Sequence, residues 1–446
     1  MKTMNKHGKD TTMLPGAPPD DLDDEILRWT FYMQQAFRML PGGQPTPNSR
    51  AAAIALSAVY DAVNSIEPIG KPYLGTVPVG DGCSRDRGDC LAAAVNDAAA
   101  FALIGSLPRA DVSLYVLSAY AIEDKRIGRG AGAEAGSKVG RLAALRVLQD
   151  RQNDGIDNNT PFILEPTPGA WRPTGNGCAA PVTPNFGKVR PFAPKSGSQF
   201  RPERPGGFGT YAELLASDLY AEQFNEVQKV GRFDAEQRGN RTADQSEAAV
   251  FWANDVDGTY HPPGQYLDHT RIISQQCGLT LVQNARLFGL LGITLGDTAI
   301  SAFDSKYETA IDLWRPQTAI QLAGTDGNPA TSPDPDWAPL LLNAAGTLRV
   351  NPCFPAFTSG HATFAGAWSG LLRCFFGTDD IAFTGTTDDP QAVGVTRAFP
   401  TLSAAALETA LSRIYLGVHF RFDGESGLAS GQALGEFIFS TQLQPT

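Results

Sequence analysis

The chain carries the stretch LSRIYLGVHFRFDGESG at residues 411–427, in which basic, imidazole and carboxylate side chains alternate with large apolar ones. A helical pattern leads into it over 403–416 and should stop at Gly417, because glycine commonly follows the last helical residue. On an unbroken helix Arg413 and His419 would point in different directions. A break at Gly417 lets the chain fold back, so that both side chains can converge on one point.

A carboxylate stands one helical turn after the histidine of this stretch. His419 and Asp423 are four residues apart, so the carboxylate can accept a hydrogen bond from one imidazole nitrogen. This contact would set the tautomer of His419 and raise the basicity of its other ring nitrogen. The alternative is a surface arginine beside a solvated His–Asp pair, and the apolar residues around these positions weigh against it.

A second stretch, NPCFPAFTSGHATFAGAWSGLLRCFF at residues 351–376, predicts an anion-binding helix end. Ser359 is a good N-cap for a helix that begins near His361. Gly360 has no side chain, so its N–H can approach an anion closely, and the helix N-terminus adds a partial positive charge. A hydroxyl, an amide and an imidazole would thus meet at one place. The alternative is a capped helix with a packed histidine.

A third stretch, KYETAIDLWRPQTAI at residues 306–320, adds two positive charges, Lys306 and Arg315. A helical pattern over 279–314 predicts one long helix, and Pro316 predicts that it ends or kinks there. The nine positions from Lys306 to Arg315 correspond to about 900° of rotation, which places the two side chains on opposite faces. A π-bulge or unwinding before Pro316 would be needed to bring them together.

The length and composition are those of a globular protein, with 446 residues, 42% of them hydrophobic and 19% charged. Helical periodicity is common and strand-like alternation is rare. This predicts a mainly α fold of two helix-bundle halves packed together, with long irregular loops. The predicted helices include 48–66, 89–106, 108–123, 132–149, 210–230, 243–253, 264–276 and 361–376. The predicted parts are a flexible lead at 1–22, a helical part at 23–150, a Pro/Gly-rich long loop at 151–207, and a helical bundle at 208–446 that carries the three stretches.

The net charge of −11 argues against nucleic acid and anionic membranes as partners. The longest largely apolar stretch, 287–296, is too short to span a membrane, so no span is expected. Basic residues near the N-terminus are not followed by an apolar segment, so no secretory signal is expected, and the compartment stays open. The six cysteines form no CxxC pair. Cys83 and Cys90 form either a small disulfide loop or two free thiols.

Taken in order, the three stretches resemble the signature of the vanadium haloperoxidase and type 2 phosphatidic acid phosphatase superfamily. Ser412-Arg413, His419 and Asp423 match its last part in full, 359–361 matches the middle part, and Lys306 with Arg315-Pro316 matches the first part in kind. Beyond these motifs, about 240–440 and SAVYDAVNSIEP at 57–68 look like the bacterial haloperoxidase-like branch. Two departures stand out. Thr358 replaces the usual proline, and eight residues separate Lys306 from Arg315 where the family usually has six.

The resemblance implies vanadate as cofactor and a role for each matching residue. His419 would be the axial vanadium ligand, held by Asp423, and His361 would be the acid–base group. The side chains of Lys306, Arg315, Arg413 and Ser359, with the Gly360 amide, would hold the vanadate oxygens. Fixed cations and N–H donors suit such a tetrahedral oxyanion. Phe354 would line the halide side of the pocket. A phenylalanine at this position is similar to the residue found in chloroperoxidases.

The implied activity is oxidation of halide by hydrogen peroxide to a hypohalous-type species that halogenates a small organic acceptor. Two alternatives stay open. One is an acid phosphatase of the same superfamily, with His419 as nucleophile and His361 protonating the leaving group. The other is an oxyanion-binding protein without turnover. The halide, the acceptor and a possible homo-oligomer are left open by the sequence.

Overall fold

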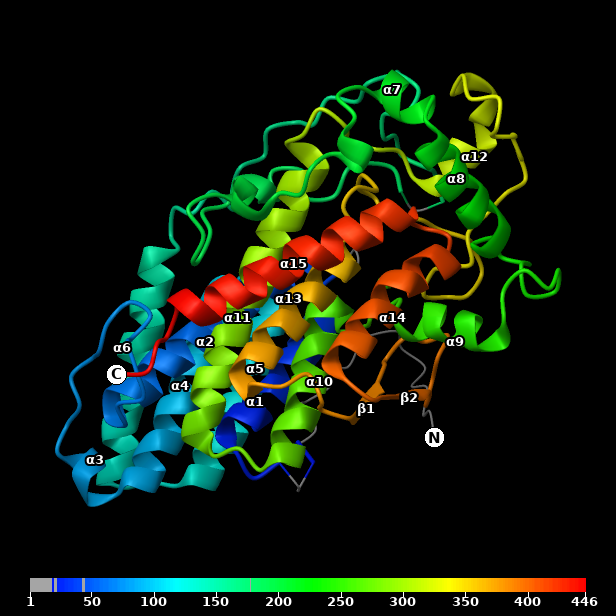
Figure 1. Cartoon of the computed structure of the whole chain (residues 1–446). Coiled ribbons are helices and arrows are strands. Elements are labelled where there is room, and N and C mark those ends of the chain that lie inside the picture. The colour runs from blue at the N-terminus through cyan, green and yellow to red at the C-terminus, as the bar shows by residue number, and fades with distance from the viewer. Residues whose placement is uncertain (1–17, 20–21, 42–44, 177) are drawn as a thin grey trace, which may run out of the picture.

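Helices dominate the computed structural model, which describes residues 18–19, 22–41, 45–176 and 178–446 (Figure 1). The predicted lead at 1–22 lies almost wholly outside the described residues. Within them the α-helices are α1 (Glu25–Arg38), α2 (Pro45–Ile66), α3 (Gly82–Arg85), α4 (Arg87–Ser106), α5 (Ala110–Ile127), α6 (Ala131–Asp150), α7 (Tyr211–Leu215), α8 (Asp218–Val230), α9 (Ala243–Phe251), α10 (His261–Cys277), α11 (Leu281–Tyr307), α12 (Pro316–Gln321), α13 (Gly360–Phe376), α14 (Leu402–Tyr415) and α15 (Arg421–Thr441). The prediction of a mainly α, bundle-type fold is confirmed.

The long helix α11 runs through the core and connects the two groups of helices. It packs against α2, which packs in turn against α4, and α4 packs against α6. On its other side α11 contacts α13 and α15 (Figure 1). Nearly every residue of α2 and α11 is buried, since each helix is covered on several sides. The division of the chain into four parts stays a prediction.

Two helices are apolar and long enough to cross a membrane, α4 and α11. The apolar window of α11 is 100% buried inside the molecule, and that of α4 is 67% buried. Both are accounted for as core helices, because their apolar surface is covered by other helices of the same chain.

Helix α15 was not predicted, because its sequence is rich in glycine, which is a poor helix former. The structure shows why the glycines are there. α15 lies along α13 (Figure 1), and a Cβ at Gly431 would stand 2.0 Å from the carbonyl oxygen of Thr363. A Cβ at Gly366 of α13 would stand 2.1 Å from the carbonyl oxygen of Leu428. Close helix packing therefore requires glycine on both sides of the contact.

Several predicted boundaries are wrong. The helix expected over 279–314 ends at Tyr307, and the helix expected over 210–230 is divided between α7 and α8. α2 begins at Pro45, three residues before the expected start of the helix over 48–66. A short antiparallel hairpin, β1 (Phe383–Thr386) and β2 (Thr396–Phe399), was also not predicted. In it Phe383 pairs with Phe399, and Thr386 with Thr396.

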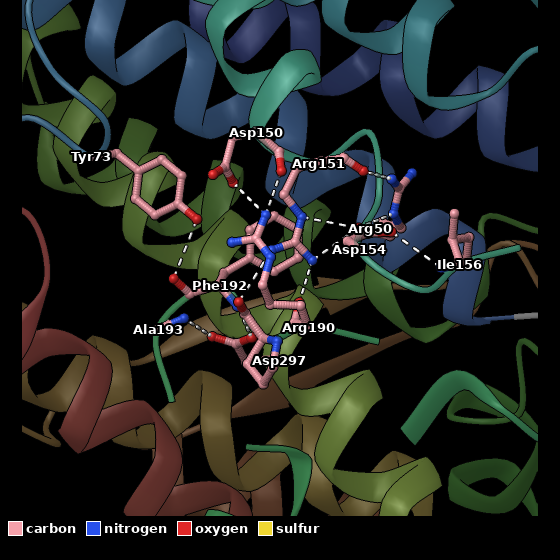
Figure 2. Close-up of polar contacts among 11 residues, drawn as sticks. Arg50, Tyr73, Asp150, Arg151, Asp154, Ile156, Arg190, Phe192, Ala193 and Asp297 are labelled. Carbon is pink, nitrogen blue, oxygen red and sulfur yellow. Dashed lines mark hydrogen bonds and ion pairs between the residues drawn. The ribbon is translucent and has the colours of Figure 1, made fainter. Parts of the chain in front are cut away.

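The Pro/Gly-rich stretch 151–207 contains only short 3₁₀ turns, at Phe186–Lys188, Gly197–Phe200 and Pro205–Gly207. A buried polar cluster fixes it to the helices (Figure 2). Asp297, in the middle of α11, accepts hydrogen bonds from the backbone N–H groups of Phe192 at 2.6 Å and Ala193 at 3.0 Å. Burial raises the pKa of Asp297 to about 7, because these two amides only partly replace the lost water.

Arginines complete this cluster (Figure 2). Arg151 stacks on the ring of Phe192, with its guanidinium carbon 4.0 Å from the ring centre, and its Nε donates to Asp154 at 3.0 Å. Arg50 of α2 donates to the same carboxylate at 2.8 Å.

Disulfides are formed by Cys83 with Cys90 and by Cys178 with Cys353. The second disulfide joins the irregular stretch to the segment that precedes α13.

Candidate active site

The three stretches singled out from the sequence meet in space. Lys306 lies in the last turn of α11, and Arg315 is the N-cap of α12. The N-cap of α13 is Ser359, followed by Gly360 and His361. Arg413 lies in the last turn of α14, His419 in the short connection to α15, and Asp423 in the first turn of α15. A pocket lined by Asp255, Phe354, Gly360, His361, Arg413 and His419, among others, lies between them.

His419 is held from both ring nitrogens. Its Nδ1 lies 3.0 Å from Oδ2 of Asp423, and its Nε2 lies 3.1 Å from Nη1 of Arg315. The carboxylate accepts a hydrogen bond from the Nδ1–H group. Nε2 therefore carries the lone pair and accepts a hydrogen bond from Arg315. Burial, and then the charges of Arg315 and Lys306, hold the pKa of His419 well below its ordinary value. A neutral imidazole with a lone pair at Nε2 therefore faces the cations.

Asp423 joins this histidine to two helix ends. The same Oδ2 accepts the backbone N–H of Phe420 at 2.9 Å, which caps the start of α15. The carbonyl oxygen of Asp423 accepts the N–H of Ser359 at 3.0 Å and so ties α15 to the N-terminus of α13. Burial raises the pKa of Asp423, while the amide of Phe420 and the nearby cations oppose the rise.

Arg315 is completely buried and has no counter-ion in contact. Its Nε donates to the carbonyl oxygen of Phe354 and its Nη1 to that of Val418, both at 2.8 Å. No carboxylate of the described residues lies within 4.0 Å of it, and its Nη2 has no hydrogen-bond partner among them. Burial lowers the pKa of Arg315 to about 9. A buried guanidinium with a free donor and no contacting anion is energetically costly, so this position favours the binding of an anionic ligand.

Lys306 reaches this region because α11 ends at Tyr307, so the opposite-face argument for one continuous helix does not apply. Its ammonium donates to the carbonyl oxygens of Pro355 at 2.8 Å and Ala356 at 3.2 Å, and to that of Thr358. The three protons of the ammonium are thereby used. Lys306 brings positive charge and holds the segment before Ser359, while direct contact with an oxyanion would require one of these bonds to be exchanged.

Arg413 is paired with a carboxylate that the sequence analysis missed, Asp255. Nη2 of Arg413 lies 2.6 Å from Asp255 Oδ2, and the Asp255 Oδ1 lies 3.7 Å from Nε2 of His361. Burial works to raise the pKa of Asp255, but the attraction of His361 and Arg413 outweighs it, and the pKa is lowered. Asp255 lies within the region of about 240–440 that resembles the bacterial haloperoxidase-like branch, yet no spacing links it to Arg413, 158 residues later.

His361 is buried beside this pair, and its Nε2 lies 2.8 Å from the carbonyl oxygen of Ala253. Burial, followed by the charge of Arg413, lowers the pKa of His361 to about 4. At neutral pH the imidazole is therefore uncharged and able to take up a proton. A negative ligand in the pocket would raise this pKa again.

The N-terminus of α13 is open to a ligand. Ser359 caps it, with Oγ accepting the N–H of Ala362 at 3.4 Å. A Cβ built on Gly360 would meet no atom within 4 Å, so there is free space beside this amide. The N-cap predicted at Ser359 is observed, and the helix starts one residue earlier than expected, at Gly360.

The donor set fits an oxyanion such as vanadate. Three cations, Lys306, Arg315 and Arg413, face two carboxylates, Asp255 and Asp423. Besides Nη2 of Arg315, Nε of Arg413 is buried without a hydrogen-bond partner in the described residues. In those residues no cluster of three His, Cys, Asp or Glu side chains suits a bare metal cation. The site therefore offers two guanidinium donors without a partner among the described residues, an open helix N-terminus and the lone pair of His419 Nε2. This set suits an oxyanion whose central atom could also bind a nitrogen.

Phe354 stands at the boundary of this pocket. Its ring centre lies 4.8 Å from Nζ of Lys306 and 4.9 Å from the guanidinium carbon of Arg315. The ring also lines a second, larger cavity of about 640 Å³ on its other side, together with Pro352 and Asp255. These three residues are shared by the two hollows.

Comparison with known proteins places this arrangement in context. Residues 286–445 match the family model described as the VCPO second helical-bundle domain. A vanadium chloroperoxidase from Curvularia inaequalis is 28% identical over 325 residues, which are 58% of this chain and 52% of the relative. The chain thus spans about half the length of that relative.

Solved structures agree over nearly the whole chain. A bacterial vanadium-dependent iodoperoxidase superposes with a TM-score of 0.72 at 22% identity, covering 96% of this chain and 97% of the other. A bacterial vanadium-dependent chloroperoxidase in its holo form superposes with a TM-score of 0.71 at 15% identity, covering 95% of both chains. The resemblance drawn from the sequence is therefore confirmed: the chain has the fold of bacterial vanadium haloperoxidases, and its residues 286–445 match the VCPO second helical-bundle domain.

Proposed function

We propose that this protein is a vanadate-dependent haloperoxidase, which uses hydrogen peroxide to oxidise halide to a hypohalous-type species that halogenates organic acceptors. The observation that carries the proposal is the buried Arg315, which no carboxylate of the described residues contacts and which lies beside the lone pair of His419 Nε2. The similar proteins, a vanadium chloroperoxidase and two bacterial vanadium-dependent haloperoxidases, support it over the phosphatase alternative.

In the proposal, His419 Nε2 is the vanadium ligand, and Asp423 keeps the proton on Nδ1 so that the lone pair stays available. Arg315 would hold the oxyanion through Nη2, which has no partner among the described residues, and through Nη1 once this donor is released from the imidazole. Arg413, Ser359 and the amide of Gly360 supply further charge and hydrogen bonds. Each charge-assisted hydrogen bond contributes roughly 1.5–3 kcal/mol. Bound vanadate would supply a Lewis-acid centre that activates hydrogen peroxide toward attack by halide.

His361 is proposed as the group that moves protons. Its neutral imidazole, next to Asp255 and Arg413, can take a proton from peroxide and return it to a leaving oxygen. Negative charge on a bound oxyanion raises its pKa from about 4 toward the working pH, which suits both steps. Phe354, packed on two cations, is proposed to line the halide side of the pocket, and chloride is the proposed substrate.

The two histidines give a matched test of these roles. His419→Ala should purify without bound vanadium, because the nitrogen that would hold it is lost, whereas His361→Ala should keep it and lose most halogenation. Vanadium content after incubation with vanadate and desalting, and halogenation of a trapping dye, are the two measurements. Stoichiometric vanadium in His419→Ala would contradict the ligand assignment, and unchanged turnover in His361→Ala would remove it from proton transfer.

A further inference from the structure

The cavity of about 640 Å³ beside the candidate site is not needed for the oxidation of a halide ion. Its volume lies within the range of pockets that hold small organic molecules, about 300–1,000 Å³. Its walls come from Asn176 and residues 179–182 of the irregular stretch, the connection 255–257 between α9 and α10, and the segment 341–354 before α13. Because Phe354 and Asp255 also line the candidate site, a molecule in this cavity would stand next to the halide side of the pocket.

The lining of the cavity is largely apolar and carries no positive charge. Val182, Val256, Leu341, Leu348 and Val350 contribute apolar surface. None of the described residues that line it is a lysine or an arginine. Two aspartates, Asp255 and Asp257, are part of the lining, and Asp255 is already paired with Arg413. An anionic molecule would therefore lose water without gaining a counter-charge. An uncharged or cationic molecule with an apolar body suits these walls.

Polar atoms are present in small number and at defined places. Asn351, in the segment before α13, donates its amide to Gln317, and its Oδ1 has no hydrogen-bond partner among the described residues. Asn176 and Asn343 add further amides to the wall. The unpartnered Oδ1 of Asn351 is itself covered by the protein, so a molecule in the cavity would be held mainly through its apolar body.

Covalent and hydrogen bonds connect the wall segments of the cavity to each other. The disulfide between Cys178 and Cys353 crosses from one wall to the other, and the N–H of Val182 donates to the carbonyl oxygen of Cys353 at 2.9 Å. The segment 341–350 folds back on itself, with Val350 N–H donating to Leu341 O at 3.1 Å. The cavity is thus preformed, which lowers the entropic cost of binding.

We propose that this cavity binds the organic acceptor, as an electron-rich aromatic molecule that is uncharged or cationic. The inference rests on the proposed haloperoxidase function. In the transfer step, an electron pair of the ring carbon forms the carbon–halogen bond while the halogen–oxygen bond of the hypohalous acid breaks. The carbon then loses its proton, and that proton with the departing hydroxide leaves as water. Hydrogen peroxide is the oxidant of the preceding halide step.

Binding of three related probes to the protein without vanadate tests the cavity directly. Indole is neutral, tryptamine is cationic and indole-3-acetate is anionic, and the rings are the same. Titration calorimetry should give indole and tryptamine dissociation constants at least tenfold lower than that of indole-3-acetate. Equal binding of all three, or no saturable binding of indole, would overturn the proposal.

Variants that fill the cavity locate the binding. Ala345→Trp and Ala180→Trp lie on opposite walls at exposed backbone positions and should each weaken indole binding at least tenfold. Val393→Trp, at a position that is 84% exposed and outside the cavity lining, is the control and should bind indole as the wild type does. If both cavity variants bind indole unchanged, the site lies elsewhere and the proposal is wrong.

Halide oxidation without any acceptor, measured as peroxide consumed with vanadate present, separates this inference from the proposed function. The cavity variants should oxidise halide at the wild-type rate and lose only acceptor turnover. Normal halide oxidation with no indole binding would mean that free hypohalous acid does the halogenation, and the cavity proposal would fail alone. Cavity-dependent indole binding without any halide oxidation would keep the binding site and overturn the proposed function.

Discussion

Replacing Asp423 by asparagine and by alanine separates the charge of this residue from its hydrogen bonds. Both side-chain bonds, to His419 Nδ1 and to the N–H of Phe420, use Oδ2, and Oδ1 has no partner among the described residues. In Asp423→Asn the amide oxygen can take the place of Oδ2 and accept both bonds. In Asp423→Ala both are lost.

The magnitudes follow from these contacts. Alanine removes a helix cap, at about 1 kcal/mol. It also leaves a buried N–H of His419 unsatisfied, at about 1–3 kcal/mol. The free energy of unfolding should therefore fall by about 2–4 kcal/mol, and vanadate affinity by about 10–100-fold, because the imidazole is no longer oriented. Asparagine should keep the stability within about 1 kcal/mol and lose less than about tenfold in affinity, since only charge has changed.

Urea unfolding of the vanadate-free proteins and titration calorimetry with vanadate measure the two effects. We expect both the free energy of unfolding and the vanadate affinity to decrease in the order wild type, Asp423→Asn, Asp423→Ala. Wild-type vanadate affinity in the alanine variant would refute the role of Asp423 in holding His419. An asparagine variant as weak as the alanine variant would show that the charge, and not the hydrogen bonding, is what matters.

Three further predictions test the surroundings. Lys306→Ala removes a buried positive charge, so vanadate affinity should fall about tenfold (about 1.4 kcal/mol), and unchanged affinity in calorimetry would place the ammonium outside the site. Gly431→Ala puts a Cβ 2.0 Å from Thr363 O and should lower the free energy of unfolding by about 1–3 kcal/mol. Gly424→Ala in the same helix, where the nearest atom would lie 3.4 Å away, should be neutral or stabilising by up to about 1 kcal/mol, and equal losses in urea would contradict this. The carboxyl of Asp297 keeps its proton up to about pH 7 in the folded state but loses it near its ordinary pKa of 3.8 when unfolded. Its contribution to stability is therefore full below that value and declines by about 4 kcal/mol as the pH rises to 7. Asp297→Asn should lack this decline, and parallel stability–pH curves of the two proteins would refute it.

The parts of the site that are local in the chain could be predicted from the sequence. The pairing of His419 with Asp423 follows from a spacing of one helical turn, and the capped helix end at Ser359 follows from its residue type. The chain reversal at Gly417, which has a φ of +83°, follows from its need for glycine. Each of these features depends on a few neighbouring residues.

The remaining parts depend on contacts between distant segments. Asp255 reaches Arg413 only because α9 and α14 pack together, and no local pattern marks that contact. Lys306 and Arg315 can lie in one site because α11 ends at Tyr307. The helical periodicity of the sequence continues past this residue, so it did not predict the helix end. The glycines of α15 lower its helix propensity, and only the packing against α13 explains them.

Whether the protein is a vanadate-dependent haloperoxidase can be measured as turnover of the purified protein with hydrogen peroxide and each halide, with and without added vanadate, followed by a halogen-trapping dye. We expect halogenation that requires vanadate, with chloride among the halides used. Absence of halogenation, together with cleavage of an aryl phosphate that vanadate inhibits, would contradict it and make His419 the nucleophile of a phosphatase.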